Sequence, residues 1–494
     1  MPPNLYTRWR VVSPGWLALR ESAVADSPPE RLLQLIWLHQ RVRREALTTL
    51  DGRPLTVLHP GFWNREAGPD FRQAVIQFDR EAPVSGDVEV DVRPECWRQH
   101  RHHENPAFAE VRLHVVWSGQ APGPLPTLAL GDQLDAPLPD VESWLATEAA
   151  AASLGIAQAG RCATPLRELL PAAREELLRQ AAWVRFERKA GAIAVRARAV
   201  GWDRALWEGL FSALGYKRNT WPMRRLAELS PKLLATAGGM AEQVLVLQAL
   251  LLGVAGFLPI EPPRTAGAGA YWRRLWDVWW REQAALDGWV LPRSLWRLHG
   301  IRPANHPQRR IALAAHWLAE GQVPRRLEAW VQRPVLERDL VSSLLGCLQV
   351  GHDGFWSHHW TLNSRATPGP HPLLGEARCS DLAVNVILPW LWSRATVGGD
   401  PSLSAQIEQR YFAWPAGEDN AVLKLACRRL LGPAPVRLPP QAAAQQGLLQ
   451  IVRDFCDHAN AICEGCRFPE LVRTLVVPAS DKTEPSTLPE SSTR

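Results

Sequence analysis

The chain has 494 residues, of which 46% are hydrophobic and 21% charged, as in folded globular proteins of two or three domains. A formal charge of +6 excludes a histone-like polycation. Only five of the 56 basic residues are lysine, so the positive charge is nearly all guanidinium, a group suited to phosphates. A GC-rich coding sequence, which also enriches Ala, Pro and Trp, is the simpler explanation of this bias.

The sequence predicts a soluble, cytoplasmic protein with no membrane association. The N-terminal segment MPPNLYTRWRVV lacks the apolar core of a signal peptide. The longest apolar stretch, residues 244–260, is short for a membrane span and contains two glycines. Eight cysteines in such a chain indicate reduced thiols or metal ligands rather than a disulfide framework.

The first elements predict an α/β (or α+β) domain with a small mixed sheet. A helix is expected over residues 27–50, because Ser27 can cap it, Pro28 suits its first position and Glu30 completes a capping box. Apolar or alternating patterns predict strands at 55–60, 71–78, 86–92 and 111–117. Residues 96–103 are expected to form a short helix between the last two strands.

The rest of the chain predicts a large all-α domain and a short tail. We place the first domain at residues 1–135, with a Pro- and Gly-rich connector at about 118–139. Helical patterns dominate residues 140–432, and a second linker candidate follows at 433–441. Residues 441–475 form a cysteine-bearing tail, and residues 478–494 have the composition of a disordered segment.

Four charged residues alternate with valines on the third strand. Asp87, Glu89, Asp91 and Arg93 are expected on one face, and a hairpin would bring Asp70 towards them from the start of the neighbouring strand. Alternating charge is typical of a solvated sheet face. However, three successive acids on one face repel each other, which favours a bound cation. Carboxylates of this kind are the ligands of Mg²⁺ or Mn²⁺.

Three histidines, His100, His102 and His103, follow the strand and add candidate metal ligands or a base. If the segment is helical, His100 and His103 share a face and His102 points elsewhere, so we rank His100 first. By contrast, a single histidine on an apolar strand, His114, is interpreted as a satisfied core residue.

Pro69-Asp70 before one strand and Glu89-Val90-Asp91 on the next resemble the PD-(D/E)xK nuclease core. That resemblance implies that Asp70 and Glu89 bind Mg or Mn. The sequence departs from the motif at Asp91, where the family has a lysine that orients the attacking water. Arg93 is a substitute on the same face, but arginine cannot act as a base.

A second resemblance covers nearly the whole chain. The segments GPDFRQAVI (68–76), GDVEVDV (86–92), WRQHRHHE (97–104), VRLHVVW (111–117), IRPANHPQRRIA (301–312) and CEGC (463–466) resemble an uncharacterised bacterial domain-of-unknown-function family. In that family a histidine usually stands at the position of Asp91. The resemblance implies an architecture and no established activity.

Cys456, Cys463 and Cys466 form a second candidate metal site. The spacing C-x6-C-x2-C is typical of thiolates that converge on zinc or an iron–sulfur cluster. A fourth ligand is required, and His458, Cys427, Cys379 and Cys162 are the candidates. Free buried thiols are the alternative.

Three functional hypotheses follow. In the first, the protein is a metal-dependent nuclease or phosphodiesterase: Asp70 and Glu89 hold the ion, Asp91, His100, His102 or His103 serve as a further ligand or base, and Arg93 steadies the phosphate. The second is a non-catalytic nucleic-acid-binding or scaffold protein with a degenerate nuclease fold. The third is a zinc or iron–sulfur protein whose main metal site lies in the tail. The sequence leaves open whether the protein is an enzyme.

Overall fold

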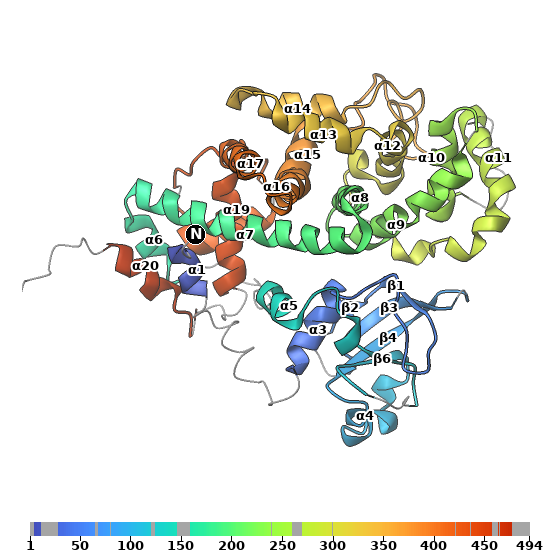
Figure 1. The fold of residues 1–494 in the computed structure, drawn as a ribbon, viewed down its shortest axis with the longest axis horizontal. Helices are drawn as coiled ribbons and strands as arrows, with labels where there is room; N and C mark the ends of the chain where they lie inside the picture. Colours follow the sequence, from blue (N-terminus) through green and yellow to red (C-terminus); the bar gives the residue numbers. More distant parts are fainter. Residues whose placement is uncertain are drawn as a thin grey trace, which may run out of the picture.

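The computed structural model contains a mixed β-sheet followed by a large helical region (Figure 1), which confirms the predicted fold class. It describes residues 4–10, 28–64, 68–79, 81–119, 124–145, 159–238, 240–258, 269–298, 300–419, 421–434, 436–456, 463 and 465–476. The segment 478–494, predicted to be disordered, lies outside these residues.

The sheet has six strands: β1 (Leu55–His59), β2 (Phe62–Trp63), β3 (Phe71–Phe78), β4 (Val84–Asp91), β5 (Val111–Val116) and β6 (Thr127–Ala129). The order is β1-β3-β4-β5-β6, and β2 pairs with β3. Strands β1, β3 and β4 are antiparallel neighbours, whereas β5 runs parallel to β4 and β6 parallel to β5. The connector predicted at 118–139 was therefore wrong in part, because β6 joins the sheet by backbone pairing that its Pro- and Gly-rich surroundings do not reveal.

The first long helix, α3 (Glu30–His39), is much shorter than the predicted helix over 27–50. It ends because Gln40 adopts a left-handed conformation, with φ of 49°, and donates its backbone N–H back to the last turn. Ser27, the predicted cap, lies outside the described residues. With α5 (Leu138–Leu145), α3 packs its apolar side chains on the face of the sheet that carries Val88 and Val90.

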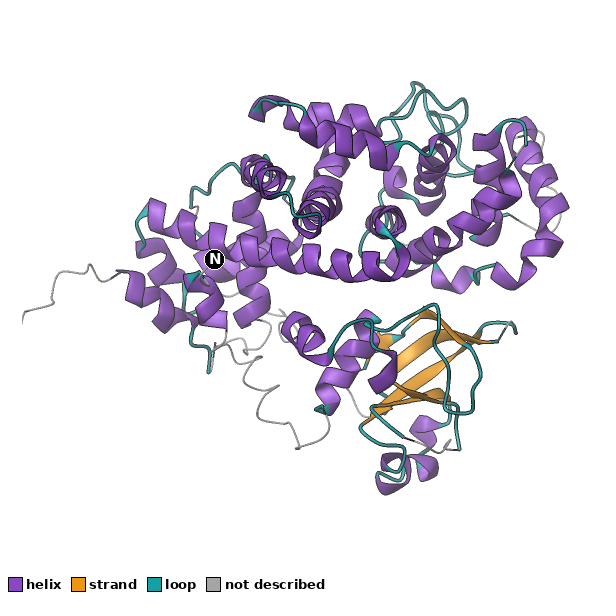
Figure 2. Ribbon diagram, in the orientation of Figure 1, coloured by secondary structure: helices purple, strands orange, loops and turns teal. Residues whose placement is uncertain are grey.

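The remaining chain is helical (Figure 2). Its helices are α1 (Leu5–Arg10), α6 (Ala163–Glu168), α7 (Pro171–Val200), α8 (Trp202–Leu214), α9 (Thr220–Ala237), α10 (Gln243–Val254), α11 (Gly269–Leu286), α12 (Pro307–Glu320), α13 (Val323–Gln332), α14 (Leu340–Leu348), α15 (Glu376–Leu382), α16 (Leu388–Val397), α17 (Pro401–Ala413), α18 (Ala421–Leu431), α19 (Ala442–Ile451) and α20 (Phe468–Val476). The thirty-residue α7 runs across the molecule and links the two ends of this region. Among the described helices, none combines the length and the apolar character that a bilayer span requires.

The sheet docks against the helices through its β1–β3 end. Leu58 and Val75 are buried in the main helical core. An ion pair of 2.9 Å joins Arg44, after α3, to Glu228 of α9, with both side chains 7% exposed. The helix α4 (Cys96–Gln99), by contrast, lies at the tip of the sheet farthest from the helices (Figure 1). The candidate site described next is at that tip.

Candidate metal centre

Strand β4 carries two buried carboxylates on the face opposite α3. Glu89 is 7% exposed and Asp91 only 1%, while Val88 and Val90 on the other face are fully buried. The predicted alternation is therefore present, but the face is not solvated, because the segment between β4 and β5 covers it. The strand ends at Asp91, and Arg93 lies beyond it with an exposed side chain.

Asp70 lies beside these acids, as the hairpin predicted. Its Oδ2 accepts a hydrogen bond of 3.1 Å from the backbone N–H of Val90, and its own N–H donates to Oε2 of Glu89 at 3.1 Å. Gln34 of α3 donates to Oδ1 of Asp70 at 2.8 Å and to Glu30 at 3.1 Å. The side-chain amide of Gln34 thus fixes Asp70 and links the carboxylate of Glu30 to the edge of the site.

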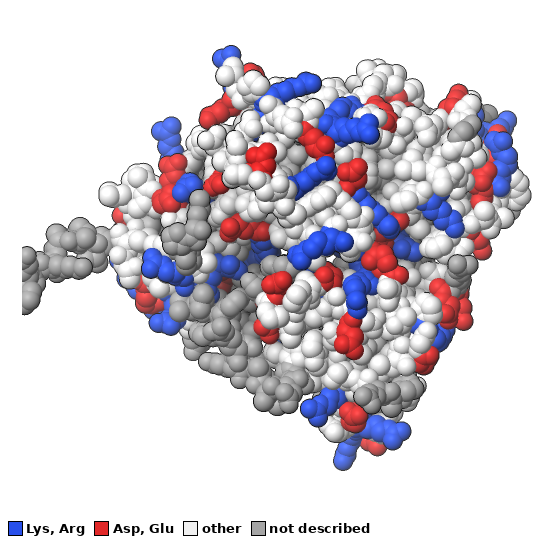
Figure 3. Space-filling view, viewed as in Figure 1, with Lys and Arg blue, Asp and Glu red and all other residues white. Residues whose placement is uncertain are grey.

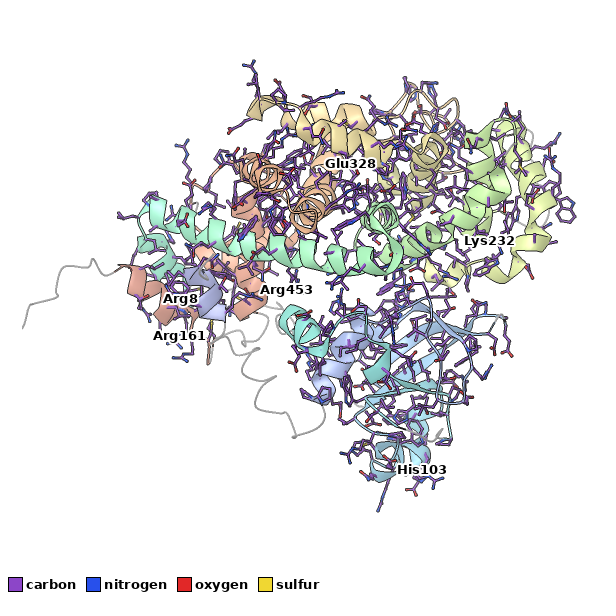
Figure 4. All side chains as sticks on the ribbon, in the orientation of Figure 1. Arg8, His103, Arg161, Lys232, Glu328 and Arg453 are labelled. Atoms are coloured by element: carbon purple, nitrogen blue, oxygen red, sulfur yellow. The ribbon has the colours of Figure 1, made fainter. Side chains whose placement is uncertain are left out.

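The histidine segment does not form the predicted helix over 96–103. Helix α4 ends after one turn, and Arg101, with φ of 56°, reverses the chain before a short 3-10 turn begins at His102. The expected pairing of His100 with His103 was therefore wrong: His100 and His102 both face the acids. His103 is 45% exposed, lies 3.5 Å from Glu104 and is at the outer tip of the molecule (Figure 4).

Each of the two buried carboxylates on β4 meets an imidazole. His100 Nδ1 lies 3.3 Å from Oδ1 of Asp91, and His114 Nε2 lies 2.9 Å from Oδ2 of the same residue. His102 Nε2 lies 3.3 Å from Oε1 of Glu89. His114 is buried, as predicted for a core histidine, but it also holds Asp91 in place from the neighbouring strand, since it is in register with Glu89.

His102 has a buried ring nitrogen without a hydrogen bond. Its Nε2 is shielded from solvent and has no hydrogen-bond partner among the described residues, although it is aimed at Glu89. The ring is fixed between Trp97 and Phe108, with centroids 5.3 and 4.1 Å away. Burial lowers the pKa of His102, so the imidazole is neutral and its nitrogen can donate a lone pair. A buried acceptor without a partner normally costs stability, and a metal ion would satisfy it.

The geometry of the three residues Asp91, His100 and His102 fits one ion. Each offers a ligand atom, and all of these atoms lie within 4.8 Å of one another. Two imidazoles and a carboxylate are a common donor set for Zn²⁺, Mn²⁺ and Fe²⁺. Asp70, Glu89 and His103 are outside this group, although Glu89 touches it through His102.

Burial and mutual repulsion disfavour the charged forms of the carboxylates at this site. Burial, together with the charge of Asp70, raises the pKa of Glu89 to about 9. Burial and the charge of Glu30 raise the pKa of Asp70 to about 7. Perturbed acids of this kind cluster at functional sites, where a cation would favour their charged forms.

The comparisons with known proteins identify a family. A model described as "protein of unknown function (DUF2851)" matches residues 30–420. The chain belongs to this family. No curated protein and no solved structure matches the chain. The matched region includes the whole sheet and the Asp91 group and ends before Cys456.

Proposed function

We propose that the protein is a divalent-metal-dependent phosphodiesterase acting on nucleic acid. The observation that carries the proposal is the group of Asp91, His100 and His102, whose ligand atoms fit one ion, with the buried Nε2 of His102 also 3.3 Å from Glu89. Asp91, His100 and His102 would hold the metal, and the neighbouring Glu89 would complete its coordination. The imidazoles favour Mn²⁺ over Mg²⁺, which prefers oxygen ligands alone.

Basic side chains around the site support a phosphate substrate. Arg93, Arg98 and Arg101 flank α4, and all three have exposed side chains. Basic side chains, with acidic ones between them, lie at this tip of the molecule (Figure 3). Guanidinium groups bind phosphate oxygens bidentately, so they would hold a nucleic-acid backbone against the metal.

The order of elements also supports the proposal. A helix, the antiparallel strands β1, β3 and β4, a crossover and the parallel strand β5 follow one another, with Asp70 just before β3 and Glu89 on β4. This order resembles that of the PD-(D/E)xK core. The metal would lower the pKa of a bound water and supply the nucleophile. Asp70, with a pKa of about 7, is suited to receive the proton of that water.

The position of Asp91 favours a second candidate. This residue stands where the nuclease motif has lysine, and both its oxygens face histidines. A site without that lysine fits a protein that binds metal and nucleic acid but does not cleave.

One experiment separates the two. Purified protein is incubated with labelled single-stranded DNA, double-stranded DNA and RNA, in Mn²⁺ or Mg²⁺ and then with EDTA, while binding is followed against salt concentration. We expect Mn²⁺-dependent cleavage that is lost in His102→Ala and in Glu89→Gln. His103→Ala is the matched control, because His103 points away from the acids, and it should keep both metal and activity.

Cleavage that survives Asp70→Ala and Glu89→Ala would refute the assigned site. Salt-sensitive binding without cleavage, in protein that retains its metal, would favour the second candidate.

A further inference from the structure

The second cluster of metal-ligating residues lies at the opposite end of the molecule. Cys162, Cys456, Cys463 and Cys466 are 3–7% exposed and belong to one hydrophobic cluster built around α1, α6, α18, α19 and α20. In Figure 1, α1, α6 and α20 lie together near one end of α7, far from α4. All eight cysteines of the chain are free thiols.

The four cysteines come from two remote parts of the chain. Cys162 caps the start of α6, and Cys456 ends the π-helical turn that follows α19. Cys463 and Cys466 lie in a tight turn before α20, closed by a hydrogen bond of 3.3 Å from the N–H of Cys466 to the carbonyl of Cys463. Cys463 has a left-handed φ of 58°. Such a turn directs two thiols to the same side.

Arg429 ties these segments together. Its side chain is buried, and it donates from Nη2 to Sγ of Cys463 at 2.9 Å. Its carbonyl accepts a hydrogen bond of 2.7 Å from the N–H of Gly160. A Cβ built on Gly160 would lie 3.4 Å from Sγ of Cys162 and 3.5 Å from Nε of Arg429. Arg429 therefore contacts Cys463 directly and, through Gly160, lies close to the segment that carries Cys162.

The thiols also influence one another electrostatically. Burial raises the pKa of Cys162 to about 12, with further contributions from Cys466 and Cys463. The pKa of Cys456 is raised well above its usual value by burial first, and then by Cys162, Cys466 and Cys463. Cys427, which is packed at the edge of the same cluster, has no cysteine among the causes of its raised pKa.

We propose that Cys162, Cys456, Cys463 and Cys466 form a structural tetrathiolate site for a thiophilic metal, with zinc as the ion. This selects Cys162 among the four candidates for the fourth ligand. Cys379 lies in a different core, Cys427 is only partly buried at the edge of the cluster, and His458 is outside the described residues.

A bound metal would draw the four sulfurs closer together than they are in the metal-free chain. No three of these four sulfurs lie mutually within 4.8 Å. Rotation about one Cα–Cβ bond moves a cysteine sulfur by roughly 3 Å, so changes of rotamer would bring the thiols closer to one another. Zinc binding displaces the thiol protons and satisfies four buried sulfurs at once, at Zn–S distances of about 2.3 Å. The site would fasten α20 to α6 and to the end of α19.

The test is metal content by elemental mass spectrometry on protein purified under reducing conditions, with free thiols counted before and after zinc is displaced. We expect one equivalent of zinc and four protected thiols. Cys162→Ser and Cys466→Ser should each lose this zinc, although the two positions are remote in sequence. Cys427→Ser is the matched control and should retain it.

Different variants distinguish metal bound by the four cysteines from metal bound by the Asp91 group. Loss of zinc in Cys466→Ser should leave metal at the Asp91 group, and His102→Ala should leave the four thiols protected. Reconstitution of stripped protein with Co²⁺ adds a readout that misfolding cannot mimic, namely the intense visible bands of a tetrahedral cobalt thiolate. Four freely reactive thiols, a Cys463–Cys466 disulfide, or zinc that survives Cys162→Ser would overturn the proposal, and so would iron with acid-labile sulfide in place of zinc.

Discussion

Replacing Glu89 by glutamine should stabilise the metal-free protein. In the folded chain the pKa of this carboxyl is about 9, against 4.5 for an ordinary glutamate. At about pH 7.5 folding must therefore protonate Glu89 across roughly three pKa units, which costs about 4 kcal/mol. Glutamine avoids this cost, keeps an oxygen for the N–H of Asp70, and presents its amide to the unpartnered Nε2 of His102.

The size of the effect depends on pH. Because the pKa of Glu89 is raised on folding, the penalty is absent below about pH 4.5, where both states are protonated, and grows until about pH 9. We expect Glu89→Gln to gain roughly 2–4 kcal/mol at about pH 7.5, allowing for imperfect replacement, and nothing at about pH 4. Thermal or urea unfolding of EDTA-treated protein at both pH values measures this difference.

Metal removes most of this difference between the two proteins. An ion at 100 times its Kd stabilises the wild type by about 2.7 kcal/mol, and Glu89→Gln should lose most of that gain. Glu110→Gln, an exposed carboxylate just before β5, is the control and should change neither quantity. An equal effect of Glu89→Gln at both pH values, or destabilisation at about pH 7.5, would refute the argument that burial and neighbouring acids strain this carboxylate.

Three further predictions concern ions, a loop and helix packing. Metal binding to the Asp91 group should release protons, and the metal affinity should increase between about pH 6 and 9, because Asp70 with a pKa of about 7 must ionise. Calorimetry in buffers of different ionisation enthalpy measures the proton release. Burial alone would raise the pKa of Asp353, but hydrogen bonds from side chains and backbone N–H groups hold it at about 2. This carboxylate therefore contributes about 2 kcal/mol of stability above pH 4, which is lost as pH falls through 2. Asp353→Asn should remove that contribution and flatten the acid limb of the curve of unfolding free energy against pH. Gly447→Ala should destabilise the protein by about 2–4 kcal/mol, because its Cβ would lie 2.3 Å from the carbonyl oxygen of Leu178 on α7. Gly346→Ala in α14 meets nothing within 4 Å and should stabilise the protein by roughly 1 kcal/mol. Urea unfolding of the two variants measures both effects.

Local patterns were sufficient to predict the frame of the site. Alternation of valines and charges placed Glu89 and Asp91 on one face, and the hairpin placed Asp70 beside them. These are relations between residues adjacent in sequence or across one turn, where strand periodicity fixes the geometry. The burial of the acids was not predictable, because it depends on a segment that folds over the face.

The choice of histidines could not be predicted from helical spacing. One left-handed residue, Arg101, exchanges the roles of His102 and His103, and a non-glycine residue with positive φ leaves no reliable mark in a sequence. His114 is likewise brought to Asp91 by the parallel register of β5, which is set after a crossover rather than a turn. Cys162 lies at the other end of the helical region from its partners in sequence, so only the fold distinguishes it from Cys379 and Cys427.

The acid at position 91 explains why this site should take its cation from solution. In the nuclease motif a lysine at this position supplies a positive charge beside Asp70 and Glu89. Aspartate in place of lysine changes the local charge by two units. Its negative charge adds to the burial, and to the charges of Glu30 and Asp70, that raise the pKa values of the two neighbouring acids. A divalent ion restores that difference, and the two imidazoles on the α4 crossover lie where they can bind it. Under the proposed function, a bound metal at Asp91, His100 and His102 would supply the positive charge that a lysine supplies in the nuclease motif.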